Sequence, residues 1–219
     1  MAKAKTVRRN VVRDLTILEN SLKRKLLTFY NTKIKPEAGT TPIEQLKQRY
    51  NSYIINLIRK TVQDSYLKGN ELVGRQIKIT DFDIVITGTD IDNIAKISAA
   101  MTTSFWNTAS KLHRRETEFK LNKDRELEEK EPFDKNAAMV AASALVVYSA
   151  FNGSILSKTQ EIPQPARVQF TTANDSHVDP KLCQPHANEI FDENNVPIDA
   201  QPPLHRHCRC ILVPLPDIS

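Results

Sequence analysis

The spacing of apolar residues divides this chain into two parts. Up to about residue 151 they recur every three or four positions, which places them on one face of an α-helix. Beyond Pro163 and Pro165 the pattern changes, because residues 167–172 alternate and are rich in β-branched side chains, as strands are. We therefore predict an α+β protein, with a mostly helical region at residues 1–162 and a small, strand-poor, Cys/His-rich module at residues 163–219.

Two helices are predicted in the first eighty residues. The first runs from about residue 7 to 35 and ends before Pro36. The second begins after Thr41, a capping residue followed by Pro42 at the first helical position and by Glu44, which can bond back to the cap. Gly69 and Gly74 weaken the period, so this helix is predicted to end between them. Residues 77–87 fit either a short strand or an extended connector.

Two further helices follow. Asp90 is an acceptable N-cap for the third, whose continuation over residues 114–131 is so rich in charges of both signs that we expect it to project into solvent, up to Pro132. Asp134 can cap the fourth, which is apolar nearly all round over residues 137–151 and is expected at the centre of the core. In the C-terminal module we predict strands at 167–172 and 210–213, and a hairpin that joins 190–191 to 196–198.

Composition and charge exclude some classes of protein. Hydrophobic residues make up 40% of the 219 residues and charged residues 26%, as in globular proteins. No apolar stretch is long enough to cross a bilayer, and the N-terminus lacks the apolar core of a secretory signal, so we expect a cytoplasmic product with no membrane partner.

The positive charge is concentrated at the N-terminus. Residues 1–35 carry a net charge of +8, whereas the whole chain carries +5. This segment can meet the phosphates of double-stranded DNA or an acidic protein surface, or it can be a solvated helix face. The candidate contact residues are Arg8, Arg9, Arg13, Lys23, Arg24 and Lys25.

The C-terminal module contains all three cysteines and four of the five histidines. Cys183 and His186 have the spacing of a metal knuckle, and Cys208 and Cys210 point to one face of an extended segment. A structural zinc ion bound by these four residues, with His205 or His207 as a substitute ligand, would compensate for a small core. The alternatives are a disulfide from Cys183 or three reduced, buried thiols.

A hydrolytic centre is a further alternative. Asp175, His177 and Asp179 lie just before the cysteine cluster and could act with His205, although such residues near turns usually cap the local backbone. Arg209 points away from the flanking cysteines if its segment is extended, and can pair with Asp175 or Asp179. We do not expect an enzyme.

The order of motifs over residues 167–216 resembles the C-terminal domain of the Mu F-like head morphogenesis proteins of phages. The matching pieces are Thr171-Thr172 with Asp175, Val178-Asp179-Pro180, Cys183-Gln184-Pro185-His186, Ile190-Phe191, Pro202-Pro203-Leu204-His205, Cys208-Arg209-Cys210 and Pro214. His186 stands where the family has a second cysteine, and the small turn that usually follows is replaced by Ala187-Asn188-Glu189.

The resemblance implies a minor capsid protein of a tailed virus, made in the host cytoplasm and located in the virion near the portal vertex. Its partners would be the portal protein and capsid or scaffold proteins, with possible contact to packaged DNA. Asp175, Pro203 and Arg209 would belong to the structural motif, beside the candidate metal ligands. The competing hypotheses are a zinc-stabilised nucleic-acid-binding module and a zinc-dependent nuclease.

Overall fold

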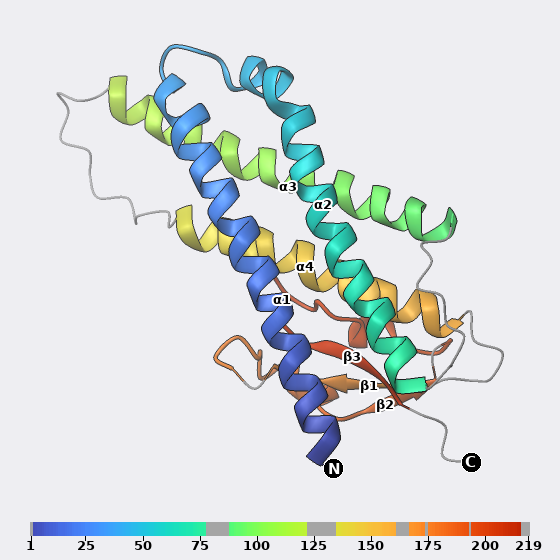
Figure 1. The fold of residues 1–219 in the computed structure, drawn as a ribbon. Helices are drawn as coiled ribbons and strands as arrows, with labels where there is room; N and C mark the ends of the chain where they lie inside the picture. Colours follow the sequence, from blue (N-terminus) through green and yellow to red (C-terminus); the bar gives the residue numbers. More distant parts are fainter. Residues whose placement is uncertain are drawn as a thin grey trace.

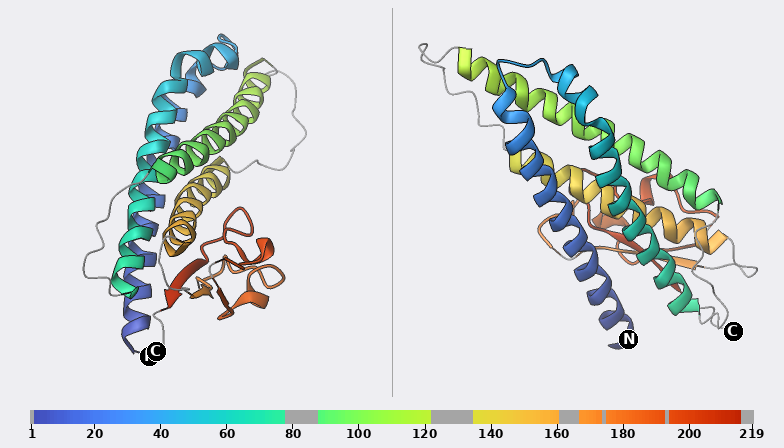
Figure 2. Two further views of the ribbon diagram at one scale, coloured as in Figure 1. Left: turned by 90° about the vertical axis from the view of Figure 1, so that its right-hand side faces the viewer. Right: turned by 45° about the horizontal axis from the view of Figure 1, so that its top comes forward.

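The computed structural model describes residues 2–77, 88–121, 135–173 except 161–166, 175–192 and 194–215. Four long helices and a three-stranded antiparallel sheet form the α+β architecture expected from the sequence. Helices α1 (Ala2–Phe29) and α2 (Ile43–Ile77) lie side by side on one side of the molecule (Figure 1). Behind them, α3 (Gly88–Leu121), α4 (Lys135–Gln160) and the C-terminal module follow one another from one end to the other (Figure 2).

The first helix has the length that its apolar stripe predicts. It continues beyond Phe29 as a π-helical turn (Tyr30–Ile34) and a 3₁₀ turn (Lys35–Glu37). Helix α2 begins one residue after the predicted start, and the hydroxyl of Thr41 donates to the carboxylate of Glu37 rather than capping α2.

The predicted end of the second helix between Gly69 and Gly74 is wrong. Helix α2 continues through both glycines to Ile77, and Gly69 serves packing against α4. A Cβ atom at Gly69 would lie 2.8 Å from the carbonyl oxygen of Phe151 in α4 and closer still to Ser154 Oγ. The absence of a side chain therefore lets α2 and α4 approach closely.

Helix α3 begins at Gly88, two residues before the predicted cap. Asp90 is instead buried in the first turn, where its Oδ2 lies 3.1 Å from Lys158 Nζ and its Oδ1 accepts a hydrogen bond from Tyr66. The helix predicted from residue 114 is present as far as Leu121, and most of its side chains are exposed. It does not project freely into solvent, because Lys120 Nζ donates to the carbonyl of Ala38 at 2.8 Å and Glu116 pairs with Lys35 at 3.3 Å. Residues 78–87 and 122–134, which include the predicted strand or connector and the cap at Asp134, lie outside the described residues.

The sheet has the order β2-β1-β3, with all neighbours antiparallel. The central strand is β1 (Arg167–Thr171), flanked by β2 (Ile190–Asp192) and β3 (Ile211–Leu215). The predicted hairpin is wrong, since residues 190–192 pair with β1 and Ile198–Ala200 forms a 3₁₀ turn. Pro197 precedes that turn and has no N–H group to donate to a ladder.

Helix α4 is the centre of the molecule, as its apolar sequence predicts. One cluster of buried side chains surrounds Phe105 and Trp106 and joins α1, α2, α3 and α4. A second cluster joins Leu15 of α1 and Val147 and Phe151 of α4 to the sheet and to all three cysteines. The C-terminal module therefore shares a core with the helices, and the predicted domain boundary at residue 162 lies outside the described residues.

Among the described residues, none of the helices is both long and apolar enough to cross a membrane.

Candidate metal centre

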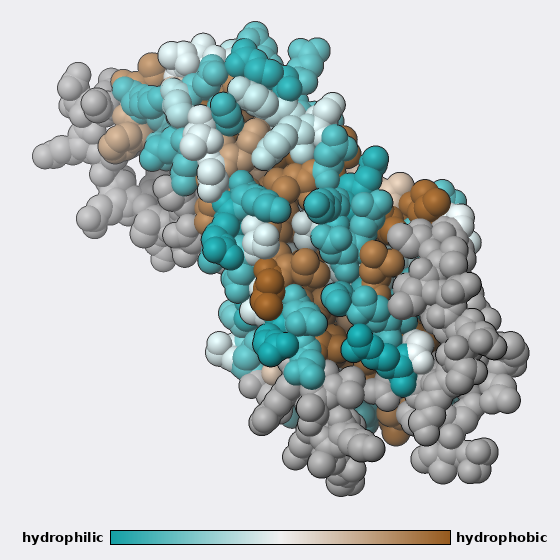
Figure 3. Space-filling model, viewed as in Figure 1, coloured by the Kyte–Doolittle hydropathy of each residue, from teal (hydrophilic) through white to brown (hydrophobic). Residues whose placement is uncertain are grey.

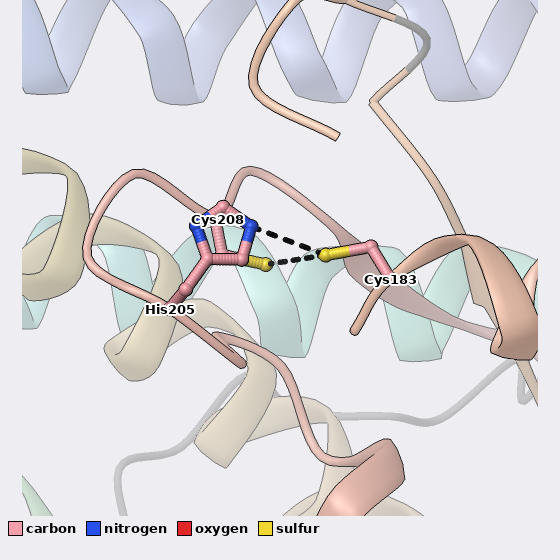
Figure 4. A group of neighbouring side chains, drawn as sticks. All are labelled: Cys183, His205 and Cys208. Carbon is pink, nitrogen blue, oxygen red and sulfur yellow. Dashed lines mark hydrogen bonds between the residues drawn. The ribbon is translucent and has the colours of Figure 1, made fainter. Parts of the chain in front are cut away.

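Three of the predicted ligands meet in the C-terminal module. The sulfur of Cys183 lies 3.2 Å from Nε2 of His205 and 3.8 Å from the sulfur of Cys208 (Figure 4). The three donor atoms all lie within 4.8 Å of one another, so this group can hold a metal ion. Both thiols are fully buried, and His205 is partly exposed.

Short turns bring these side chains together. Cys183 ends a turn in which its N–H donates to the carbonyl of Asp179 at 2.9 Å. The carboxylate of Asp179 accepts hydrogen bonds from the N–H groups of Lys181 and Leu182, which holds the pKa of Asp179 below its ordinary value. A second turn places the N–H of Cys208 3.0 Å from the carbonyl of His205.

The third cysteine borders the group. The Cys210 thiol donates a hydrogen bond to Cys208 and thereby lowers the pKa of Cys208 to about 5, against the opposing effect of burial. The same hydrogen bond, together with burial, raises the pKa of Cys210. Burial also raises the pKa of Cys183. Thus one thiolate, at Cys208, is stabilised among three buried sulfurs, all of which are free of disulfides.

Two predicted ligands lie elsewhere. His186 places its Nδ1 2.7 Å from a carboxylate oxygen of Glu189, and its ring contacts Phe170 with the ring centroids 5.7 Å apart. His207 stacks on His177 at a centroid distance of 5.9 Å, and burial together with that neighbour lowers the pKa of His207. His205, which the sequence offered as a substitute, is therefore the histidine in the group.

The arginine between the two neighbouring cysteines connects the centre to the first helix. Arg209 forms a bidentate ion pair with Glu19, with Nη2 2.7 Å from Oε1 and Nε 3.0 Å from Oε2. Its Nη1 also lies 3.5 Å from Asp175 Oδ2, so the predicted pairing with Asp175 is confirmed. Asp175 in addition accepts a hydrogen bond from the N–H of His177. Sequence reasoning missed Glu19.

Helix α4 holds the other side of the same segment. Asn152 is buried, and its amide nitrogen donates to the carbonyl of Cys210 at 3.2 Å. Its Oδ1 accepts the N–H of Leu212 at 2.8 Å. These bonds satisfy backbone groups on the edge of β3 and fix the strand that follows the cysteines. Asn152 was also missed, although an amide that directly follows the apolar run 137–151 is itself a signal.

The remaining predicted site residues do not belong to the group of donor atoms. Pro203 is joined to Pro202 by a cis peptide bond before the loop that carries His205. Arg13, Arg24 and Lys25 are exposed on α1, and Lys23 is half-buried. The side chains of Arg8 and Arg9 lie outside the described part of the structure.

The chain matches no protein family, no curated protein and no solved structure.

Proposed function

We propose that this protein is a structural minor capsid protein of a tailed virus, which acts in head morphogenesis near the portal. The proposal rests on the motif order of the C-terminal module. It is supported by one observation: Cys183 and, at least 22 positions later, His205 and Cys208 all belong to that motif order and converge on a single group of donor atoms.

The metal that suits this group best is zinc. Two thiolates bound to tetrahedral zinc at ~2.3 Å each would lie about 3.8 Å apart, which agrees with the 3.8 Å between the sulfurs of Cys183 and Cys208. A disulfide would bring them to about 2.05 Å. Cys210, whose thiol lowers the pKa of Cys208, lies outside this group of three and would have to shift toward it to supply the fourth ligand. When bound, the ion would cross-link the two turns of the module.

We propose a structural rather than a catalytic role for this centre. Cys183, Cys208 and Cys210 are all buried, as in closed structural sites. The acids that a hydrolytic centre would need have other roles, since Asp179 caps its own turn and Asp175 pairs with Arg209. This arrangement supports a folding role and disfavours the nuclease alternative.

The N-terminal helix would supply the contact with a partner. Arg13, Arg24 and Lys25 present positive charge to solvent on α1, where an acidic portal surface or DNA phosphates could meet them. Arg13 lies 3.8 Å from Asp14, which partly neutralises that position.

A pull-down from virus-producing cells tests the proposed function. The tagged full-length chain would be captured after nuclease treatment, its co-purifying proteins identified by mass spectrometry and its zinc content measured on the same sample. We expect portal or major capsid protein to be recovered. Recovery of nuclease-sensitive DNA alone would instead favour the nucleic-acid-binding alternative.

A further inference from the structure

An open depression of about 440 Å³ lies between the end of α1 and the first part of α2. Its volume is in the range of small-ligand sites. It lies on the side of the molecule formed by α1 and α2, where hydrophobic atoms surface along the strip between the two helices and hydrophilic residues cover their outer sides (Figure 3). The lining residues that carry the argument are Arg24, Lys25, Phe29, Lys33, Tyr50 and Tyr53.

Aromatic rings form one wall of the depression. Tyr53 stacks on Phe29, with the ring centroids 5.2 Å apart and the ring planes inclined by 23°. Tyr50 meets the same Phe29 ring edge-on at 5.3 Å. Phe29 is buried, whereas Tyr53 is 54% exposed, so the outermost ring of the stack is open to solvent while its position is fixed from beneath.

The charged residues of the lining are all cations. In the part of the chain that the structure describes, Arg24, Lys25 and Lys33 form no ion pair. Arg49, just outside the depression, differs because it is already paired with Glu37. The lining therefore complements an anion, and no ion pair among the described residues neutralises its positive charge, although Arg24 Nε donates to the carbonyl of Asn20.

The backbone places these cations on both sides of the ring stack. Lys25 and Lys33 are separated by about 12 Å along the helix axis, and Phe29, which supports Tyr53, lies between them in α1. Lys33 belongs to the π-helical turn Tyr30–Ile34. Such turns are rare and occur frequently at functional sites.

We infer that this depression binds single-stranded nucleic acid, with one base stacked on Tyr53 and the flanking phosphates on Lys25 and Lys33. Fixed aromatic rings inside a positively charged groove are the combination by which proteins hold unpaired bases. A duplex would offer phosphates but keeps its bases stacked inside, and an acidic peptide would use the cations but not the open ring face. The inference deepens the proposed contact of this protein with nucleic acid and rests on it only for its biological setting.

Direct binding to the full-length protein tests the inference. The probe is a short fluorescein-labelled oligothymidylate, followed by fluorescence anisotropy at several salt concentrations. We expect it to bind more tightly than a duplex of the same length. With Lys25 and Lys33 each on one phosphate, the logarithm of the affinity should fall with the logarithm of salt concentration with a slope of about −1.4.

Substitutions separate the ring from the charges. Tyr53→Ala should weaken oligothymidylate binding about five- to 150-fold, whereas Tyr53→Phe keeps the ring and should bind as the parent does. Phe119→Ala is the matched control, because Phe119 is a similarly exposed aromatic residue, at 56%, on α3. Lys25→Gln with Lys33→Gln should weaken binding and flatten the salt dependence, while the exposed Lys111→Gln should change neither.

Three results would overturn the inference. One is a Tyr53→Ala variant that binds as tightly as the parent, and another is equal affinity for duplex and single strand. The third is a poly-glutamate peptide that binds in a Tyr53-dependent way while oligothymidylate does not, which would assign the depression to an acidic protein segment. None of these depends on capture of portal or capsid protein, so failure here is distinguishable from failure of the proposed function.

Discussion

The guanidinium of Arg209 donates two hydrogen bonds, of 2.7 and 3.0 Å, to the carboxylate of Glu19, which lies 190 positions earlier in the sequence. Arg209 lies between Cys208 and Cys210, and Glu19 lies on α1 with only 1% of its surface exposed. The candidate metal centre is therefore tied to the N-terminal helix. An interaction that fixes the segment Cys208–Cys210 should therefore also fix the position of α1 against the C-terminal module.

Glu19→Gln should destabilise the protein by about 3 kcal/mol, because it removes one partner of a largely buried ion pair and leaves Arg209 with Asp175 alone. The free energy of unfolding would be measured by urea denaturation. Glu118→Gln, at an exposed acid on α3, is the control and should change stability by less than about 0.5 kcal/mol. Equal stability of the two variants would show that the ion pair does not hold α1 in place.

Gly69→Ala should destabilise by about 1–3 kcal/mol, because the added methyl group would collide with the Phe151 carbonyl and with Ser154. Gly153→Ala is a matched control with the opposite expected sign. A Cβ atom there meets only Ile97 Cδ1, at an ordinary 3.8 Å, and alanine favours the helix by up to about 1 kcal/mol. Thermal unfolding of both variants checks this, and a neutral Gly69→Ala would contradict the close approach of α2 and α4.

Lys158→Met should destabilise by about 3–5 kcal/mol, because it leaves the fully buried Asp90 carboxylate without its cation. Adding Asp90→Asn should restore part of the loss, since the uncompensated charge is then absent. Lys96→Met, at an exposed position of α3, is the control. A double variant as unstable as the sum of the two single variants would argue against coupling between the two side chains.

The turn before Cys183 should be sensitive to acid. The pKa of Asp179 is lowered in the folded protein by hydrogen bonds from two N–H groups, so its stabilising effect is present above its ordinary value of 3.8 and is lost as the pH falls through the lowered value. In chelator-treated protein, Asp179→Ala should be destabilising near neutral pH, and the difference from the parent should shrink below about pH 3.8. Asp199→Ala, at an exposed site, provides the baseline. A difference that is constant with pH would exclude the carboxylate as the cap.

Local patterns predicted the helices and the positions of the three strands, because burial of a single stripe or face follows directly from residue spacing. These patterns failed where contact with another helix or strand decides the local structure. Gly69 was read as a helix end, but its role is set by α4. Residues 190–191 are predicted to pair with residues 196–198 in a hairpin, but β1 is their partner.

Only part of the candidate site was predicted, again because partners distant in sequence decide the rest. The spacing of Cys183 and His186 suggested a knuckle, but Glu189 and Phe170 hold His186 away from the sulfurs. Glu19 carries a signal that could have been used, since it is an acid on the buried stripe between Leu15 and Leu22 of a strongly basic segment. Its partner, 190 positions away, follows only from the fold.

Substitution of single residues should distinguish the ligands of the candidate metal centre from neighbouring residues that do not bind the metal. We expect Cys208→Ser and His205→Ala to lose the metal and to lower the thermal midpoint, because a structural zinc ion contributes directly to folding. His186→Ala is the matched control, since it removes a histidine of the same module that lies outside the group. It should keep the metal.

Zinc content is the most direct test of the metal centre. Full-length protein, purified without chelators, would be analysed by native mass spectrometry, with the zinc quantified by elemental analysis of the same sample. The account predicts one zinc ion per chain in the parent and in His186→Ala, and none in Cys208→Ser. A parent protein without metal, or a His186→Ala variant that loses it, would contradict a centre built from Cys183, His205 and Cys208.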